Sequence, residues 1–457
     1  MAGIGFEIRK ILKKNTLLSI IEAYGLAGII SSGPWILTIL AMLIIGLVTL
    51  GMSFPTEVVI QFLVIVTYLM AGSLIISGLL QLLITRYISD LVSIRQEHRI
   101  LPNLLGAMLI ISVLAATVGV AVLNFAGTLE LTLKIVIFTT LILLSNQWLA
   151  IIMLSGMKKY YRILITMAIS YSLMLGLSFS LPPSGLLGLM LIFCFCQGIL
   201  TFAFLYDIIR EFPAERLISF EFLNPKKAFY SLVFCGVFYN LGVWLDKFVF
   251  WFNAGTSHQV IDIFRASYIY DLPIFIAYLS VVPGMAVFML HMETEFADAC
   301  VRFYDALRKG ATLTKIHSLK ENMVSACQKS LYEIFKVQGM TLLLLILWAE
   351  DILTLLNIDL TYLHLFYIDL VGVSLQVLFM AILNVMYYLD KRMSALWLIA
   401  LMAIGNVTLS SITIILGPVF YGYGFTITMF IVSVIGMITL DKQFEDLEYQ
   451  TFMLQRP

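Results

Sequence analysis

Charged side chains are scarce in this sequence. Only 12% of its 457 residues are charged, and the 28 basic and 28 acidic side chains cancel to a net charge of zero. Soluble globular proteins carry about 25% charged residues, so the composition excludes an ordinary soluble enzyme and a disordered chain. A neutral chain also lacks the basic surface that nucleic-acid binding requires.

Cysteine is also rare, with five residues that lie in apolar runs or in a segment that we predict to be cytosolic. Neither environment is oxidising, so we expect no disulfides. Cys194 and Cys196 lie on different faces of one apolar helix, which argues against a metal site there. The histidines lack metal-ligand spacing, and the chain has no glycine-rich phosphate loop. The sequence therefore predicts no metal, no cofactor and no enzymatic activity.

Hydrophobic residues, in contrast, fill 61% of the chain and form long runs. A membrane-spanning helix needs about 20 apolar residues, and the runs predict twelve such helices, six on each side of a polar segment near residue 215. The predicted spans are residues 27–50, 58–84, 104–126, 132–153, 163–181, 186–206, 228–252, 268–290, 339–356, 363–389, 393–416 and 421–440. We therefore predict an all-α polytopic membrane protein with two six-helix bundles around a central cavity.

The predicted domains follow this division. Residues 1–206 form the first bundle, residues 207–227 a cytosolic linker, and residues 228–457 the second bundle, which contains a cytosolic insertion at 291–338. Equal span number and equal orientation favour a parallel repeat about the membrane normal. The insertion has roughly helical apolar spacing and charge throughout, which is consistent with a solvated helix pair or with a docking surface for a cytosolic partner.

Lysine and arginine indicate the orientation, because they concentrate on the cytoplasmic side of membrane proteins. When the N-terminus is placed in the cytoplasm, all but three of the 28 basic residues lie on that side; the three are Lys134, Lys247 and Arg265. We therefore predict that both termini are cytoplasmic. The apolar run that follows the basic N-terminal stretch is too long for a signal peptide.

Four ionisable residues fall inside predicted spans, where a charge costs about 2.5–3.5 kcal/mol or more at the bilayer centre. Asp246 and Lys247 are adjacent in the seventh span, Asp271 begins the eighth, and Asp369 lies about two turns into the tenth. All four lie toward the outer half and could line one outward-facing chamber; the alternative is a structural ion pair. Adjacent helical residues point about 100° apart, so Arg265 or another helix could satisfy Asp246 instead of Lys247.

Aromatic side chains are dense around these charges in the seventh span. Tyr239 and Trp244 belong to a cluster that exceeds what an interfacial belt requires. They are candidates for stacking against sugar rings along a substrate pathway, with belt and core packing as the alternative.

Prolines and glycines mark candidate hinges in two spans. Gly33 and Pro34 fall early in the first span, and Pro273, Pro283 and Gly284 fall in the eighth. Proline removes a helical hydrogen bond and kinks the helix. Static kinks, which are common in membrane helices, are the alternative.

Two groups of short motifs carry a family resemblance. The first contains MAGIGFEIRK at 1–10, AYG at 23–25 and SSGPW at 31–35; the second contains DLP at 271–273, YLSVVPG at 278–284 and METEF at 292–296. Together with the length, the span number and the insertion, these motifs resemble the PelG family, the inner-membrane transport component of Pel exopolysaccharide biosynthesis.

This resemblance implies a fold similar to that of the multidrug/oligosaccharidyl-lipid/polysaccharide exporter superfamily, with two six-helix bundles in a V. It implies that an amino-sugar polymer for a biofilm matrix is moved across the cytoplasmic (inner) membrane. The implied partners are a cytosolic glycosyltransferase and membrane proteins that respond to cyclic di-GMP, for which this chain has no motif. The resemblance assigns no transport residue, so the candidates above rest on their chemistry alone.

Three other functions stay open. A flippase for a lipid-linked oligosaccharide needs cavity cations to meet pyrophosphate, and only Lys247, with Arg265 near the rim, is available. An ion-coupled drug antiporter could use the same fold. A membrane-embedded glycosyl- or acyltransferase would need an acceptor-activating pair, for which Asp246 is the one weak candidate.

Overall fold

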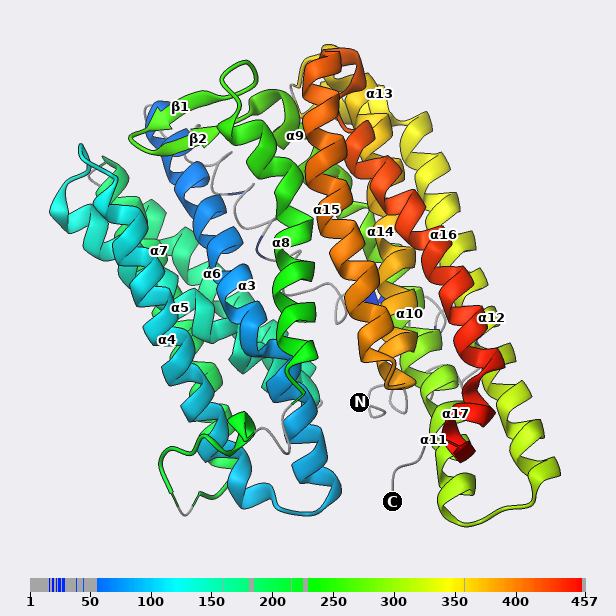
Figure 1. Cartoon of the computed structure of the whole chain (residues 1–457). Helices are drawn as coiled ribbons and strands as arrows, with labels where there is room; N and C mark the ends of the chain where they lie inside the picture. The colour runs from blue at the N-terminus through cyan, green and yellow to red at the C-terminus, as the bar shows by residue number, and fades with distance from the viewer. Residues whose placement is uncertain are drawn as a thin grey trace. The chain divides into compact units, whose positions relative to one another are not determined.

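The computed structural model describes most of the chain after residue 55. The described residues are 56–157, 159–180, 185–214, 216–224, 229–356 and 358–453, with Thr16, Ser19, Glu22, Tyr24, Gly25, Ala27, Gly28, Thr38 and Ile44. Helices make up nearly all of this part of the chain (Figure 1). Eleven of its helical segments are long and apolar enough to cross a membrane, which confirms a polytopic α-helical protein. Gly33 and Pro34, with most of the first predicted span, lie outside the described residues.

The chain divides into two compact units. Unit 1 comprises residues 1–33, 245–249 and 268–457, and unit 2 comprises residues 34–244 and 250–267. Helix α8 (Ser231–Phe252) therefore supplies residues to both units. The division into residues 1–206, 207–227 and 228–457 stays a prediction.

Five long helices form the frame of the described part of unit 2. They are α3 (Thr56–Ser93), α4 (Ile100–Asn124), α5 (Leu131–Gly156), α6 (Tyr160–Ser180) and α7 (Gly185–Glu211). Helix α5 packs against α3, α4 and α7, and α6 packs on α7. Buried side chains such as Phe62, Leu144 and Phe193 fill the core between them. Exposed faces are equally apolar, as at Val113 and Phe202, which is typical of helices surrounded by lipid.

The connection between α7 and α8 forms hydrogen bonds with α4 of unit 2. The Ser219 N–H donates to the carbonyl of Pro102 at 2.9 Å, and the Phe222 N–H donates to Oδ1 of Asn103 at 3.3 Å. Phe222 is fully buried within the short 3-10 helix η2 (Glu221–Leu223). A second 3-10 helix, η1 (Glu97–Arg99), precedes α4. These contacts attach the described residues 219–222 to helix α4 of unit 2.

Helices α3 and α8 approach each other at a pair of glycines in unit 2. A Cβ atom on Gly236 would lie 2.1 Å from the carbonyl oxygen of Gly78. Small residues allow helix backbones in membranes to approach this closely. Asn240 donates to the Gly236 carbonyl at 3.0 Å and so satisfies a polar group at the crossing.

Replacing Gly236 with alanine should therefore destabilise the protein. The new methyl group meets backbone atoms, which cannot move without shifting a helix, and overpacking of this kind costs about 1–3 kcal/mol or more. The matched control is Gly176→Ala in α6, where no atom lies within 4 Å of the new Cβ. Thermal unfolding of the detergent-purified variants measures the effect, and equal melting temperatures for both variants would contradict this packing.

A short hairpin follows α8 and is the only sheet among the described residues. It consists of the antiparallel strands β1 (His258–Ile261) and β2 (Phe264–Ala266), which the sequence analysis did not predict. Asp262 at its turn accepts hydrogen bonds from the Thr128 hydroxyl and from the N–H groups of Thr128, at 2.6 Å, and Leu129, at 3.2 Å. The Thr128 hydroxyl is the main reason that the pKa of Asp262 lies below its ordinary value, because the ionised carboxylate accepts these bonds.

Unit 1 contains the remaining helices, with α14 at its centre. They are α9 (Tyr268–Leu279), α10 (Val281–Leu290), the π-helix η3 (His291–Phe296), α11 (Ala297–Arg308), α12 (Leu313–Leu347), α13 (Ala349–Leu355), η4 (Leu360–Tyr362), α14 (Leu363–Tyr388), α15 (Arg392–Leu416), η5 (Pro418–Phe420), α16 (Tyr423–Glu445) and α17 (Leu447–Met453). Helix α14 packs against α9, α10, α12 and α16, and α15 packs on α16.

Residues 291–338 are helical, as their spacing indicates, and they continue the helices on either side. Helices α10, η3 and α11 run end to end, and the chain turns and returns along α12 (Figure 1). Gly310, with a φ of 65°, ends α11 in the left-handed conformation that favours glycine. The predicted insertion is therefore a projecting end of two long helices and not a separate domain.

Candidate functional site

Three of the predicted ionisable residues meet inside unit 1. Asp246 and Lys247 lie on the part of α8 that belongs to this unit, and Asp369 lies on α14. Their exposed fractions are 0%, 1% and 0%. Ionisable groups inside a membrane protein are costly to bury and usually mark a pathway or a proton relay. We therefore treat this cluster as the candidate site.

Asp246 is held by three donors. Its Oδ2 atom accepts from Nζ of Lys247 at 2.9 Å and from the hydroxyl of Tyr270 at 2.6 Å, and its Oδ1 atom accepts from Nδ2 of Asn406 at 3.2 Å. Ser410 donates to Oδ1 of Asn406 at 3.1 Å and so orients that amide. The position of the Asp246 carboxyl group is thus fixed by α8, α9 and α15.

Lys247 pairs with the residue that precedes it, which the sequence analysis left open. The long lysine stem bridges the 100° between neighbouring helical positions. Its Nζ atom also donates to the hydroxyl of Tyr278 at 3.2 Å. The same atom lies 5.0 Å from the ring centre of Tyr278 and 5.5 Å from that of Phe425, within the range of cation–π attraction.

Asp369 differs from Asp246 in its partners. Neither of its carboxylate oxygens has a hydrogen-bond partner in the described part of the chain. Asp369 lies close to the start of α16: a Cβ atom added to Gly422 would be 3.0 Å from its Oδ1 atom. Gly422 is the N-cap of α16 and has a φ of 84°. The positive end of a helix dipole favours an anion, but one helix end does not replace hydrogen bonds.

The charges of the cluster do not balance. Two carboxyl groups, those of Asp246 and Asp369, are near one ammonium, that of Lys247, and the ion pair joins Lys247 to Asp246. An uncompensated charge in a dry interior is expensive, so the arrangement favours a proton or a small cation on the second carboxyl group. Asp369 is the carboxyl group whose oxygen atoms have no hydrogen-bond partner among the described residues.

Asp271 is the fourth predicted ionisable residue and lies in the first turn of α9. It follows Tyr270 on α9, so its side chain points about 100° away around the helix, and it is half-buried. Its predicted place on a substrate pathway stays a prediction.

Tyr239 and Trp244 lie on the part of α8 that belongs to unit 2, and both are half-buried. The Trp244 ring lies 6.1 Å from that of Trp251, which stacks on Tyr68 at 4.6 Å. Trp251 is 1% exposed, so its ring belongs to the packed interior of unit 2. Sugar stacking by Tyr239 and Trp244 remains a prediction.

The candidate hinges in the eighth span differ from each other. Pro273 lies within the uninterrupted helix α9, whereas Pro283 follows a break at Ser280 that separates α9 from α10. Gln338 of α12 donates to the Ser280 carbonyl at 3.2 Å. A Cβ atom added to Gly284 would lie only 2.3 Å from Oε1 of Gln338. The break at Pro283 and Gly284 is therefore packed closely against α12, and motion there stays a prediction.

Four residues of the site were missed in the sequence: Tyr270, Tyr278, Asn406 and Ser410. An asparagine in the middle of an apolar span is costly, so Asn406 carried a usable signal. The two tyrosines gave none, because tyrosine is common at membrane interfaces.

A comparison with protein-family models shows the family to which the chain belongs. The PelG model, described as "Putative exopolysaccharide Exporter (EPS-E)", matches residues 1–452. This chain belongs to the PelG family. No curated protein sequence matches the chain.

Solved transporters share the fold of this PelG-family chain. An outward-facing multidrug resistance MATE family transporter of the MOP superfamily has a TM-score of 0.64 at 13% identity, covering 93% of this chain and 96% of its own. The inward-facing conformation of such a transporter gives 0.63 at 13% identity, with coverage of 93% and 95%. A MOP superfamily transporter from Pyrococcus furiosus gives 0.62 at 12% identity, with coverage of 94% and 96%.

These likenesses confirm the predicted superfamily fold with two six-helix bundles. The PelG-family chain is a multi-pass membrane protein of a transporter family, and the family indicates membership of an exopolysaccharide biosynthesis system.

Proposed function

We propose that this chain moves an amino-sugar exopolysaccharide across the cytoplasmic membrane, as the exporter of a synthase complex that supports a biofilm matrix. The observation that carries the proposal is the PelG family match over residues 1–452 on a transporter fold. The partners would be a cytosolic glycosyltransferase and membrane proteins, one of which senses cyclic di-GMP. Both termini would lie in the cytoplasm, as the distribution of lysine and arginine indicates.

The buried cluster supports coupling of this transport to an ion gradient. Asp246 and Lys247 form a fixed pair, and Asp369 beside them has carboxylate oxygens without hydrogen-bond partners among the described residues. Gain and loss of a proton or cation at Asp369 would change the charge of the cluster. Ionisable residues that act in this way are a known use of charges buried in membrane proteins.

The fold also supports an ion-coupled drug antiporter as a second candidate, because multidrug transporters share it. The flippase is less favoured, since Lys247 is already engaged by Asp246 and Tyr278 and is not offered to a pyrophosphate.

Export can be measured in cells that contain the glycosyltransferase and a labelled N-acetylhexosamine nucleotide donor. A glycoside hydrolase added outside should digest labelled polymer only when this chain is present. Equal digestion without the chain would remove the export function and favour the antiporter or a scaffolding role. Loss of all polymer without the chain would show that synthesis and export are coupled.

A further inference from the structure

The turn between α11 and α12 carries cations without acidic partners. Arg308, Lys309 and Lys315 are exposed, and none forms an ion pair within the described residues. Lysines farther along α12 behave differently: Lys329 pairs with Glu295 at 2.9 Å, and Lys336 pairs with Glu333. Arg302, two turns earlier on α11, is also exposed and forms no ion pair within the described residues. Unpaired positive charge therefore gathers toward this end of the helix pair, and we call residues 308–315 the α11–α12 tip.

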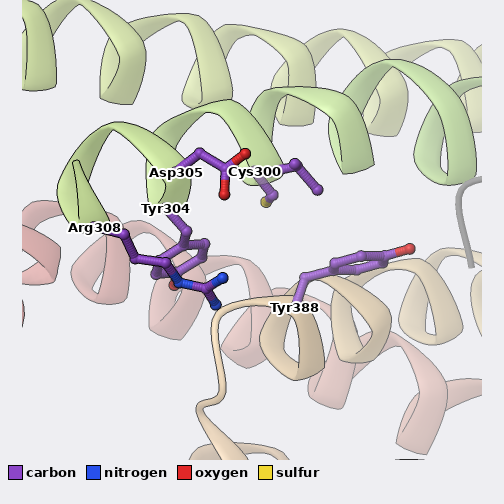
Figure 2. A pocket seen from close by; sticks show the side chains of 6 residues that line it. Cys300, Tyr304, Asp305, Arg308 and Tyr388 are labelled. Carbon is purple, nitrogen blue, oxygen red and sulfur yellow. The ribbon is translucent and has the colours of Figure 1, made fainter. Parts of the chain in front are cut away.

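A hollow opens directly beside this tip. Its volume is about 200 Å³, and its lining residues are Cys300, Val301, Tyr304, Asp305, Arg308 and Tyr388. Figure 2 shows Tyr304 and Arg308 extending from α11 toward the end of α14 that carries Tyr388. One water takes up about 30 Å³ of liquid, so the hollow has room for a side chain. Its wall is mainly apolar, and the Arg308 guanidinium and the Asp305 carboxylate are the charged groups that line it. With Lys309 and Lys315 nearby, the charge at this end of the helix pair is net positive.

The tip lies too far from the bilayer to meet lipid headgroups. Eighteen residues separate Leu290, at the end of the apolar helix α10, from Arg308. At 1.5 Å per residue they span about 27 Å, and about 21 Å if the helix is tilted by 40°. The headgroup layer is only about 5–8 Å thick on each side. The basic residues at the tip therefore lie beyond the headgroup layer. The mainly apolar wall of the neighbouring hollow favours an acidic protein segment over a small anion, because a segment can also bury an apolar side chain there.

Backbone hydrogen bonds hold the chain at the tip in a defined turn. The N–H of Gly310 donates to the Leu307 carbonyl at 3.1 Å, and that of Ala311 donates to the Ala306 carbonyl at 3.0 Å. These bonds close the last turn of α11. A surface that is ordered before binding loses less conformational entropy when a partner docks.

We propose that the α11–α12 tip receives an acidic segment of a cytosolic protein, with one apolar side chain of that segment entering the hollow. Arg308, Lys309 and Lys315 supply the charge complementarity, and Val301 and Tyr304 supply the apolar wall. The inference rests on the proposed function, because it gives the chemistry by which the exporter would hold its cytosolic partner.

Photo-crosslinking in cells that make the polymer tests this inference in the full-length chain. The crosslinking residue is placed at Leu313, which is 60% exposed at the tip, and at Ile404 on α15, which is 62% exposed, as a lipid-facing control. Leu313 should crosslink to one cytosolic protein, and the crosslinked peptide should carry an excess of aspartate and glutamate. Crosslinks to lipid, to no molecule, or to a peptide without excess acid would overturn the proposal.

Charge reversal gives the matched comparison. The variant Arg308→Glu/Lys309→Glu/Lys315→Glu should lower the crosslink yield roughly tenfold or more, because like charges at an interface repel. The control Arg95→Glu/Arg210→Glu/Arg216→Glu, at exposed sites of unit 2, should leave it unchanged. Reversing the acids of the crosslinked peptide should restore binding to the tip variant. An unchanged yield in the tip variant would refute the proposal.

A second variant separates docking from misfolding. Val301→Trp adds bulk at a half-exposed position of the hollow without changing charge, and it should also lower the crosslink yield. Export is measured in the same cells. Exported polymer without any crosslink at Leu313 would end the docking proposal alone, whereas absent export in wild-type cells would end the proposed function whatever Leu313 contacts.

Discussion

Replacing Lys247 with methionine should strongly destabilise this protein, whereas replacing Asp246 and Lys247 together should leave it folded. The single change leaves the Asp246 carboxylate buried without its ammonium, with Tyr270 and Asn406 as neutral donors. Removing one partner of a buried ion pair typically costs about 3–5 kcal/mol, while replacing both partners by neutral groups is often close to neutral. The double variant Asp246→Asn/Lys247→Met should therefore regain most of the stability lost by Lys247→Met.

Melting temperatures of the detergent-purified wild type, both single variants and the double variant measure this coupling as a double-mutant cycle. Lys442→Met, at an exposed lysine on α16, is the control and should change little. A Lys247→Met variant as stable as the wild type would show that the pair does not hold the helices of unit 1 together. Export by a folded double variant then reports whether the pair is needed for transport as well.

Asp369→Asn should abolish export while the protein stays folded and present at normal level. The amide has nearly the shape of the carboxyl group, and no hydrogen bond to the carboxylate among the described residues is lost. It cannot gain or lose a proton, so a gradient-coupled mechanism should lose export by roughly tenfold or more. Asp369→Glu keeps a titratable group and should retain part of the activity.

The external digestion assay, normalised to the amount of this chain in the membrane, measures the effect of Asp369→Asn. Asp441→Asn, at an exposed acid on α16, is the matched control. Asp246→Asn is a less selective test, because it also deprives Lys247 of its carboxylate. Full export by both Asp246→Asn and Asp369→Asn would rule out coupling through this cluster.

Hydropathy predicts the span pattern well because bilayer thickness fixes the length of an apolar run. It does not predict how far a helix continues beyond the bilayer, since water tolerates polar helix as readily as loop. Residues 291–338 therefore read as an insertion, although they extend α10 and α12. The hairpin at 258–266 was missed for a related reason: its strands of four and three residues are too short to show a period.

Part of the candidate site could be predicted from the sequence. Buried ionisable residues in membrane spans are rare, so Asp246, Lys247 and Asp369 stood out, and the structure brings them together in unit 1. Asp271 carried the same signal, but the sequence does not predict what it contacts, because the rotation of a helix about its axis depends on its packing and not on its hydropathy. The pairing of Asp246 with Lys247 depends on the flexible lysine stem, which helical geometry alone does not place.

The most direct test of the proposed transport uses purified components in lipid vesicles. The glycosyltransferase and the labelled nucleotide-sugar donor are supplied on the face of the membrane that corresponds to the cytosol, and a glycoside hydrolase is trapped in the lumen. We predict that short labelled fragments form in the lumen when this chain is in the vesicle membrane, and not in vesicles that lack it. Polymer that remains undigested with the chain present, or equal digestion without the chain, would contradict the account.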